Sequence, residues 1–121
     1  MGSVIKYIAV YEKPFWREAG YSGELVTDGG PVGLAFDDSS HDGSQAALVA
    51  FTDGGPAREW GDRSETERRM AVLNHLAQFF GPQATEPTDF IEKNWMDEEW
   101  SRGCYVGLMG PGTMTSVCPR E

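Results

Sequence analysis

One long amphipathic helix, preceded by several strand-like segments, constrains the fold of this chain more than any other feature. Ser64 and Glu67 form an S-x-x-E capping box, in which each side chain satisfies a free amide at the helix start. Gly81 and Pro82 predict the helix end, because glycine readily closes a helix and proline cannot continue one. Apolar residues at three- and four-residue spacing predict a single stripe, formed by Met70, Leu73, Leu76, Ala77 and Phe80.

The segments on either side of this helix predict an antiparallel sheet. Five stretches rich in β-branched, aromatic or other apolar residues predict strands: residues 4–11, 21–27, 32–36, 46–51 and 89–95. Asp28-Gly29-Gly30 is a strong turn signal, so the second and third strands are expected to form a hairpin. This order predicts an α+β fold, with a mostly antiparallel sheet of about five strands. One main helix, plus a short one at residues 57–60, is expected on one face of the sheet.

The polar residues of the long helix are expected on its solvent side. Arg63, Arg68 and Arg69 lie mainly off the predicted stripe, and so does His75. His41 belongs to a segment with loop composition. Neither histidine has a matched set of ligands nearby in the sequence, so both are predicted to be solvated and no metal site is predicted.

Length and charge limit the classes of partner. A chain of 121 residues has the size of one domain, and its formal net charge is −9. This acidity argues against nucleic acid and anionic membrane surfaces as partners, because phosphate groups require a basic stripe. No apolar run approaches membrane-spanning length, and the first residues do not have the pattern of a signal peptide.

Cys104 and Cys118 are the only cysteines of the chain. Their spacing is not typical of a metal site, and two cysteines alone do not make a disulfide framework. A reducing compartment is therefore expected, and the predicted location is cytoplasmic.

Two places in the chain are candidates for chemistry. Lys6 lies in an apolar strand, where an ammonium group is costly to bury unless it has a purpose or reaches water. Strand alternation also allows Lys6 to point to the solvent face. Cys104 and Tyr105 share a Gly-flanked loop, where a cysteine can be reactive, although a lone cysteine is more often inert.

Motifs in a fixed order resemble the central segment of the flavin-containing amine oxidases of the monoamine oxidase type. The resemblance covers nearly the whole chain, up to about residue 115. It rests on the following segments: Gly2-Ser3-Val4-Ile5-Lys6, Glu12-Lys13-Pro14-Phe15-Trp16-Arg17, Gly20-Tyr21-Ser22-Gly23, Asp37-Asp38, Glu92-Lys93-Asn94-Trp95, Ser101-Arg102-Gly103-Cys104-Tyr105 and Pro111-Gly112.

The resemblance implies roles for four residues. Lys6 matches the lysine that hydrogen-bonds a water next to the flavin N5 in this family. Tyr105 matches one of two aromatic residues that cage the substrate amine, and Trp95 matches a tryptophan close to the flavin. Cys104 matches the position at which animal monoamine oxidases attach FAD covalently, although many bacterial relatives bind FAD without that bond.

The sequence departs from the family pattern in its flavin-binding segments. The family holds FAD with an N-terminal G-x-G-x-x-G unit and a later G-T-E-x-A segment, and neither occurs here. Residues 1–103 are therefore expected to form part of a substrate-binding domain. Residues 104–121 are expected to form a C-terminal tail that crosses toward the flavin domain in the family. FAD is implied by the family, but the isolated chain is expected to hold no cofactor.

These observations predict a truncated substrate-binding domain that is inactive alone, because amine oxidation needs the flavin. Such a domain is expected to bind a small amine or aromatic ligand, or to self-associate. The alternative is a functional amine oxidase, completed by FAD and a partner chain. Exposed strand edges and apolar patches predict a homo-oligomer, most simply a homodimer.

Overall fold

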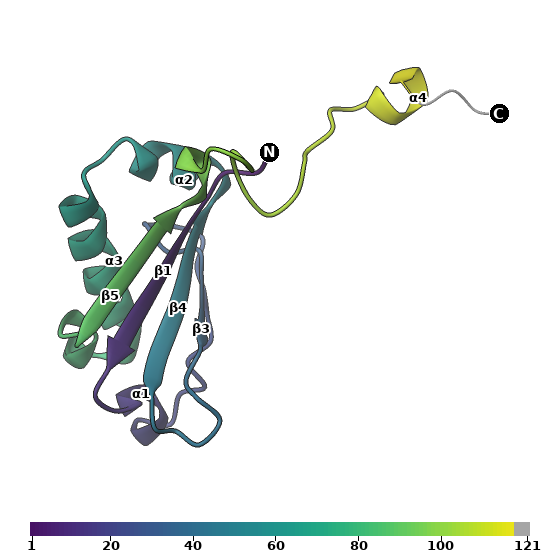
Figure 1. The fold of residues 1–121 in the computed structure, drawn as a ribbon. Helices are drawn as coiled ribbons and strands as arrows, with labels where there is room; N and C mark the ends of the chain where they lie inside the picture. The colour runs from purple at the N-terminus through teal and green to yellow at the C-terminus, as the bar shows by residue number, and fades with distance from the viewer. Residues whose placement is uncertain (118–121) are drawn as a thin grey trace.

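The computed structural model describes residues 1–117 and confirms the predicted α+β class. Five antiparallel strands form a single sheet in the order β2-β3-β4-β1-β5. Figure 1 shows the twist of this sheet. The strands are β1 (Val4–Tyr11), β2 (Leu25–Val26), β3 (Leu34–Asp37), β4 (Ala46–Asp53) and β5 (Asp89–Asn94). The two long central strands, β1 and β4, therefore organise the sheet, and β2 and β5 form its edges.

The helices are mostly short, and one is long, as predicted. They are α1 (Phe15–Glu18), α2 (Gly54–Gly61), α3 (Glu65–Phe80), α4 (Thr113–Val117) and the 3-10 turns η1 (Pro82–Thr85) and η2 (Trp95–Asp97). Helix α3 lies along one face of the sheet, whereas α4 stands away from the domain at the end of an extended segment (Figure 1). The fold is therefore a helix layer on a sheet, with a protruding C-terminal arm.

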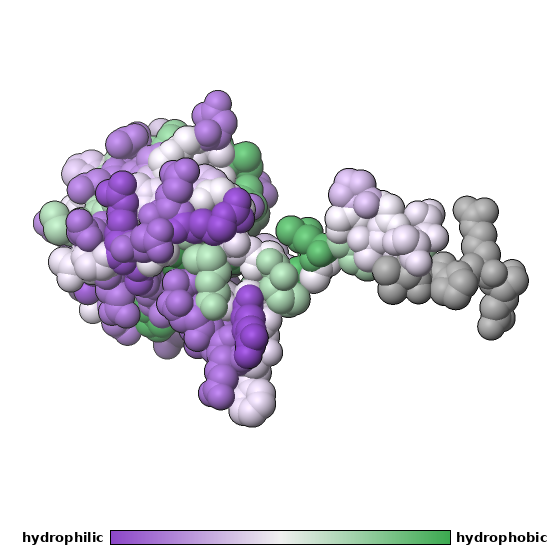
Figure 2. Space-filling model, turned by 90° about the horizontal axis from the view of Figure 1, so that it is seen from above, coloured by the Kyte–Doolittle hydropathy of each residue, from purple (hydrophilic) through white to green (hydrophobic). Residues whose placement is uncertain are grey.

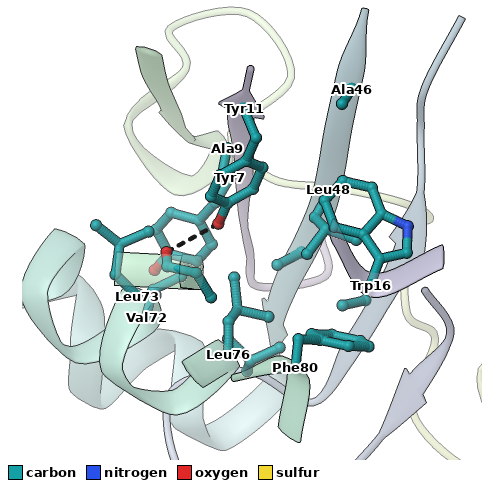
Figure 3. Packing of buried hydrophobic residues seen from close by; sticks show 14 of the residues in the cluster. Tyr7, Ala9, Tyr11, Trp16, Ala46, Leu48, Val72, Leu73, Leu76 and Phe80 are labelled. Atoms are coloured by element: carbon teal, nitrogen blue, oxygen red, sulfur yellow. Dashed lines mark hydrogen bonds between the residues drawn. The ribbon is translucent and has the colours of Figure 1, made fainter. Parts of the chain in front are cut away.

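The hydrophobic core lies between the sheet and α3. Strand alternation sends Ile5, Tyr7, Ala9 and Tyr11 of β1 to this covered face, where their side chains are buried. The residues that pack against them come from all three domain helices and from β4: Phe15, Trp16, Ala46, Leu48, Ala50, Ala57, Val72, Leu73, Leu76 and Phe80. Figure 3 shows most of this cluster between α3 and the sheet. Because this cluster joins every long element, its burial is the main source of stability.

Two buried tyrosines bring polar atoms into this core. The Tyr11 hydroxyl donates to the Ala84 carbonyl at 2.9 Å. The Tyr7 hydroxyl lies 3.3 Å from that of Thr52, which also bonds the Pro31 carbonyl. Burial raises the pKa of Tyr7 to about 12 and that of Tyr11 still further. Both phenols therefore stay neutral and tie the sheet to the segments that cover it.

The capping box at the start of α3 is confirmed. The Glu67 amide donates to the Ser64 hydroxyl, and the Glu67 carboxylate accepts from the Ser64 amide at 3.0 Å. The predicted stripe, however, is rotated relative to the observed one. Met70 is 60 % exposed, whereas Val72 is buried and was absent from the stripe. Residue spacing alone could not settle which of two overlapping stripes faces the sheet.

Two polar residues of α3 are buried, contrary to the prediction. Arg68 is 6 % exposed because its guanidinium pairs with Glu92 on the neighbouring β5. His75 is 9 % exposed, and its Nδ1 accepts a hydrogen bond from the Val32 amide at 3.3 Å. Each side chain finds its partner on a distant segment, and this satisfied partner is what permits burial.

The element boundaries also differ from the predicted ones at several points. The second strand is only Leu25–Val26, because positive-φ glycines, Gly23 and Gly30, turn the chain on either side of it. The last strand ends at Asn94, and Trp95 begins the turn η2, in which the Asn94 side chain accepts from the Met96 amide. Helix α1 was not predicted. The hairpin of β2 and β3 and the burial of β4 on both faces are confirmed.

The C-terminal arm leaves the sheet beyond residue 103. Figure 2 shows a mostly hydrophilic surface from above, with hydrophobic residues gathered where the arm leaves the domain. Val106, Leu108 and Met109 lie on this arm and are 61–76 % exposed. Residues 118–121, the end of the expected tail, lie outside the described residues. In the described part of the chain, no helix has the length and apolar character needed to cross a membrane.

Candidate functional site

The candidate site lies on the face of the sheet opposite the core, here called the open face. Lys6 projects from this face because it alternates with the core residues Ile5 and Tyr7. Its cross-strand neighbours are Phe51 on β4 and Lys93 on β5. The three side chains form one row across the sheet, and the alternative in which Lys6 points away from the core is the observed one.

Aromatic rings flank this row at both ends. The Lys6 ammonium lies 6.0 Å from the centroid of the Phe51 ring, and Tyr105 lies beyond that ring at a centroid distance of 6.0 Å. At the other end, the Lys93 ammonium lies 5.6 Å from the centroid of Trp95. The structure therefore brings three of the four predicted residues, Lys6, Trp95 and Tyr105, to one end of the open face.

The fourth residue, Cys104, is held beside Tyr105 by the N-terminal segment. The Cys104 amide donates to the Gly2 carbonyl, and the Gly2 amide donates to the Val106 carbonyl, both at 2.9 Å. The peptide bond between Cys104 and Tyr105 is cis. The approach of the two backbones is so close that a Cβ atom at Gly2 would overlap the Cys104 carbonyl. This pairing fixes the start of the arm, although Tyr105 itself is 60 % exposed.

A cavity of about 210 Å³ opens at this junction. Cys104, Tyr105, Val106 and Leu108 line one side, and the N-terminal residues, Asp53, Gly54 and Arg58 line the other. Trp95 is not among its lining residues. The pKa of the Tyr105 phenol is raised by burial and, to a smaller extent, by Cys104 and Asp53. The junction thus presents a neutral phenol, a thiol and a guanidinium to the same small space.

The charges of the row differ in their partners. Lys93 forms an ion pair with Glu98, whereas the ion pairs of residues 1–117 do not include Lys6. Lys6 therefore keeps donors that can bind a water or a ligand atom above the open face. The arrangement can hold a flat apolar group against Phe51 and Tyr105 while a cation stands beside it.

Some residues that carry the resemblance have a structural role and do not belong to the candidate site. Asp37 accepts from Trp16 Nε1 at 2.8 Å and from Arg17 Nε at 2.6 Å, so it ties α1 to β3. Burial acts to raise the pKa of Asp37, but hydrogen bonds from Arg17, Ser39 and Trp16 outweigh it and hold that pKa well below its ordinary value. These motifs build the scaffold and lie apart from the row that contains Lys6.

Glu92 also has a structural role. Its carboxylate accepts from Arg68 Nε at 2.9 Å, and the two side chains are 11 % and 7 % exposed. Arg68 also donates to the carbonyls of Gly61 and Arg63, so it joins α3 to the end of α2. The motifs that contain Asp37 and Glu92 therefore stabilise the contacts between α1 and β3 and between α3 and β5.

Sequence reasoning did not identify Phe51 or Lys93 as site residues. Both lie next to Lys6 only through the pairing of β1 with β4 and β5. The signal that could have found them is the register of these strands, which follows from alternation once the strands are paired. A larger cavity, of about 490 Å³, lies between α3 and β5 and is lined by none of the four predicted residues.

No metal centre accompanies this row. Within residues 1–117, no three His, Cys, Asp or Glu side chains are grouped so as to hold a metal ion. The acidic segment after Trp95 is used internally: Asp97 accepts a hydrogen bond from Asn94 Nδ2 at 2.7 Å, and Glu98 pairs with Lys93.

Comparisons with known proteins agree with the resemblance. The family profile described as "Flavin containing amine oxidoreductase" matches residues 1–113. The chain is 49 % identical over 114 residues to the "Probable flavin-containing monoamine oxidase A" of Dictyostelium discoideum, covering 94 % of this chain and 25 % of that protein. It is 39 % identical to the "Amine oxidase [flavin-containing] B" of Bos taurus, covering 95 % of this chain and 23 % of that protein.

Solved structures give the same result. The cyclohexylamine oxidase from Brevibacterium oxydans IH-35A matches with a TM-score of 0.87 and 37 % identity, over 94 % of this chain and 25 % of that one. Wild-type putrescine oxidase bound to putrescine matches with a TM-score of 0.80 and 41 % identity, over 85 % of this chain and 23 % of that one. The chain thus spans about a quarter of the length of its relatives, and it belongs to the family of flavin-containing amine oxidoreductases.

Proposed function

We propose that this chain forms the substrate-facing sheet of a flavin-dependent amine oxidase, and that its open face binds small amines or aromatic molecules. The observation that carries the proposal is the row on this face, in which Lys6 lies between an aromatic end at Phe51 and Tyr105 and a second at Trp95. A row of this kind offers flat contact surface and hydrogen-bond donors in one place.

Each residue of the row has a distinct part in this proposal. Tyr105 and Phe51 provide ring faces against which an apolar substituent of the amine packs. Lys6 places a positive charge nearby that no described ion pair offsets, whereas Lys93 is paired with Glu98, so Lys6 disfavours a protonated amine through like-charge repulsion. The row therefore favours the neutral amine, whose nitrogen lone pair is free. Lys6 additionally holds a water above the face through its ammonium donors.

The described residues fit one part of a flavin and not the other. Cys104, Tyr105 and Arg58 surround a cavity with aromatic, thiol and cationic groups, which suits the edge of a flavin ring. The chain carries no G-x-G-x-x-G turn, the usual cradle for the pyrophosphate. A flavin held there would supply the oxidising chemistry, which the side chains of this chain do not provide. We therefore propose that the isolated chain binds amines without oxidising them.

A second proposal is that a partner polypeptide and FAD complete an active oxidase around this chain. The observation that favours it is the C-terminal arm, whose exposed apolar residues Val106, Leu108 and Met109 would be covered by such a partner. The two proposals share the same substrate face and differ in whether the isolated chain turns over amines.

The binding proposal is tested by titrating the chain with benzylamine at alkaline pH and following backbone amide resonances. The expected result is a saturable shift confined to Lys6, Phe51, Lys93 and the segment around Tyr105. A Tyr105→Ala variant should weaken binding about tenfold, since it removes one ring face. Uniform shifts over the chain, or shifts that do not saturate, would contradict the proposal.

Tyr21 provides a matched control. It is 52 % exposed, similar to Tyr105, but its ring contacts Phe80 of α3 instead of the open face. The Tyr21→Ala variant should bind benzylamine as tightly as the unmodified chain. A visible spectrum and a peroxide assay with added FAD then separate the two proposals. A flavin band with peroxide release from the isolated chain would overturn the proposed inactivity.

A further inference from the structure

The two edges of the sheet differ in how well they are protected. At one edge, β2 has only two residues, Leu25–Val26, and is bounded by turns with positive-φ glycines. At the other edge, β5 has six residues, Asp89–Asn94, and its described strand partner is β1 alone. Short edge strands resist further pairing, whereas a long regular one offers a row of unpaired backbone groups. An added strand would therefore bind at β5.

The charges on the open-face side of β5 are self-complementary. Asp89, Ile91 and Lys93 project from this side, since they pair across to Val10, Ile8 and Lys6. Ile91 stands in the centre of the three and is 50 % exposed. Consider a second β5 placed antiparallel with the twofold axis at Ile91. Ile91 then faces its own copy, and each Asp89 faces the Lys93 of the other chain.

On the other side of β5, the same register places an aromatic ring opposite a carboxylate. With this register, Phe90 of one chain faces Glu92 of the other. Arg69 of α3 lies over Phe90, 5.3 Å from the ring centroid, and so stands beside that second carboxylate.

We propose that two copies of this chain join along β5, in an antiparallel pairing centred on Ile91 that makes one continuous ten-stranded sheet. The 490 Å³ groove between α3 and β5, lined by Thr66, Arg69, Met70 and Phe90 among others, is closed by the second copy. Met70, which is 60 % exposed at this groove, is thereby covered. The pairing is isologous, as required for a twofold dimer. It does not rest on the proposed amine binding.

The pairing is expected to be weak, because one pair of edge strands buries less surface than a stable interface. A Kd on the order of 100 µM is expected. Sedimentation of the 121-residue chain over a range of concentrations measures it. A chain that remains monomeric up to its solubility limit would overturn the proposal.

Charge reversal tests the register. Asp89→Lys puts lysines at both positions 89 and 93, and Lys93→Asp puts aspartates at both. Each single variant opposes like charges in its own dimer, so its self-association should weaken about tenfold. An equimolar mixture of the two variants restores both opposite-charge pairs and should form a heterodimer. The doubly reversed variant, with both substitutions in one chain, should dimerise like the unmodified chain.

The contrary outcomes are equally specific. Single variants that dimerise as tightly as the unmodified chain, or a mixture that does not associate, would exclude this register. Circular dichroism checks that each variant is folded. A second measurement needs no variant: amide exchange should slow with concentration in β5 and stay unchanged in β2. Exchange that slows in β2 or only in the arm would place the interface elsewhere and contradict the proposal.

Discussion

The two faces of one sheet show how differently neighbouring residues in a strand can be used. In β1, Ile5 and Tyr7 are almost fully buried beneath α3, whereas Lys6 between them meets an aromatic ring and a second lysine. The covered face contains the packing that holds the fold together. The open face contains the charges and rings of the candidate site. Stability and function are therefore separable on this sheet, face by face.

Substitution of Trp16 should give the largest difference between the faces. Trp16 is 0 % exposed, contacts the rings of Tyr11 and Phe15, and donates to Asp37. Trp16→Ala should lower the free energy of unfolding by about 4 kcal/mol, as measured by urea denaturation. The matched variant Phe36→Ala, on the open face and 37 % exposed, should cost about 1 kcal/mol. Equal losses of unfolding free energy in the two variants would show that both faces contribute equally to stability.

The buried pair of Arg68 and Glu92 gives the next largest effect. Arg68→Ala should lower the free energy of unfolding by about 3 kcal/mol, because it leaves the Glu92 carboxylate buried without its partner. The comparison variant is Lys13→Ala, which removes a pair whose side chains are 64 % and 60 % exposed. Lys13→Ala should change the free energy of unfolding by no more than about 0.5 kcal/mol. A small loss for Arg68→Ala would mean that water reaches Glu92.

Acid should weaken the covered face through His75. Burial lowers the pKa of His75 below its unfolded value of 6.5, so the folded state favours neutral imidazole. Its contribution is then fully present above pH 6.5 and is lost as the pH falls through the lower folded pKa. Stability measured between pH 7 and pH 5 should fall with acid, and His75→Gln should reduce this slope. The exposed His41 serves as a control for the substitution itself, since His41→Gln should leave the free energy of unfolding at pH 7 unchanged.

Substitution of Lys6 should have the smallest effect on stability. Lys6→Met keeps an apolar stem of similar length and removes only an ammonium at 6.0 Å from the Phe51 ring. The free energy of unfolding should change by no more than about 0.5 kcal/mol. Benzylamine binding should nevertheless depend less on pH, because one repelling charge is gone. A loss of stability comparable to that of Trp16→Ala would contradict the view that the covered face provides stability and the open face provides binding.

Local sequence signals predicted most of the helices and strands. They failed for side chains whose burial depends on a partner far away in the sequence. The capping box at Ser64, the turn at Gly29-Gly30 and the apolar segment 46–51 each act through neighbours in sequence, and each was predicted correctly. His75 and Arg68 were placed in solvent because their partners, Val32 and Glu92, are 43 and 24 residues away. A single sequence does not display such pairs.

Some residues of the candidate site could be predicted from the sequence, and others could not. Resemblance pointed to Lys6, Trp95, Cys104 and Tyr105. The structure brings Lys6, Trp95 and Tyr105 to one end of the open face, with Cys104 beside Tyr105. Their assigned roles stay predictions. Phe51, which joins Lys6 to Tyr105, could not be recognised, because an aromatic residue in a strand is ordinarily part of a core.

The sequence by itself determined the family, the α+β class, the long helix and the succession of strands along the chain. Those properties depend on local propensity, periodicity and ordered motifs, all of which are carried along the chain. Only the tertiary structure decided which face of the sheet α3 covers, which polar residues are buried, and which side chains meet Lys6. Those properties depend on strand register and on packing between segments far apart in sequence, where one residue of shift would exchange the two faces.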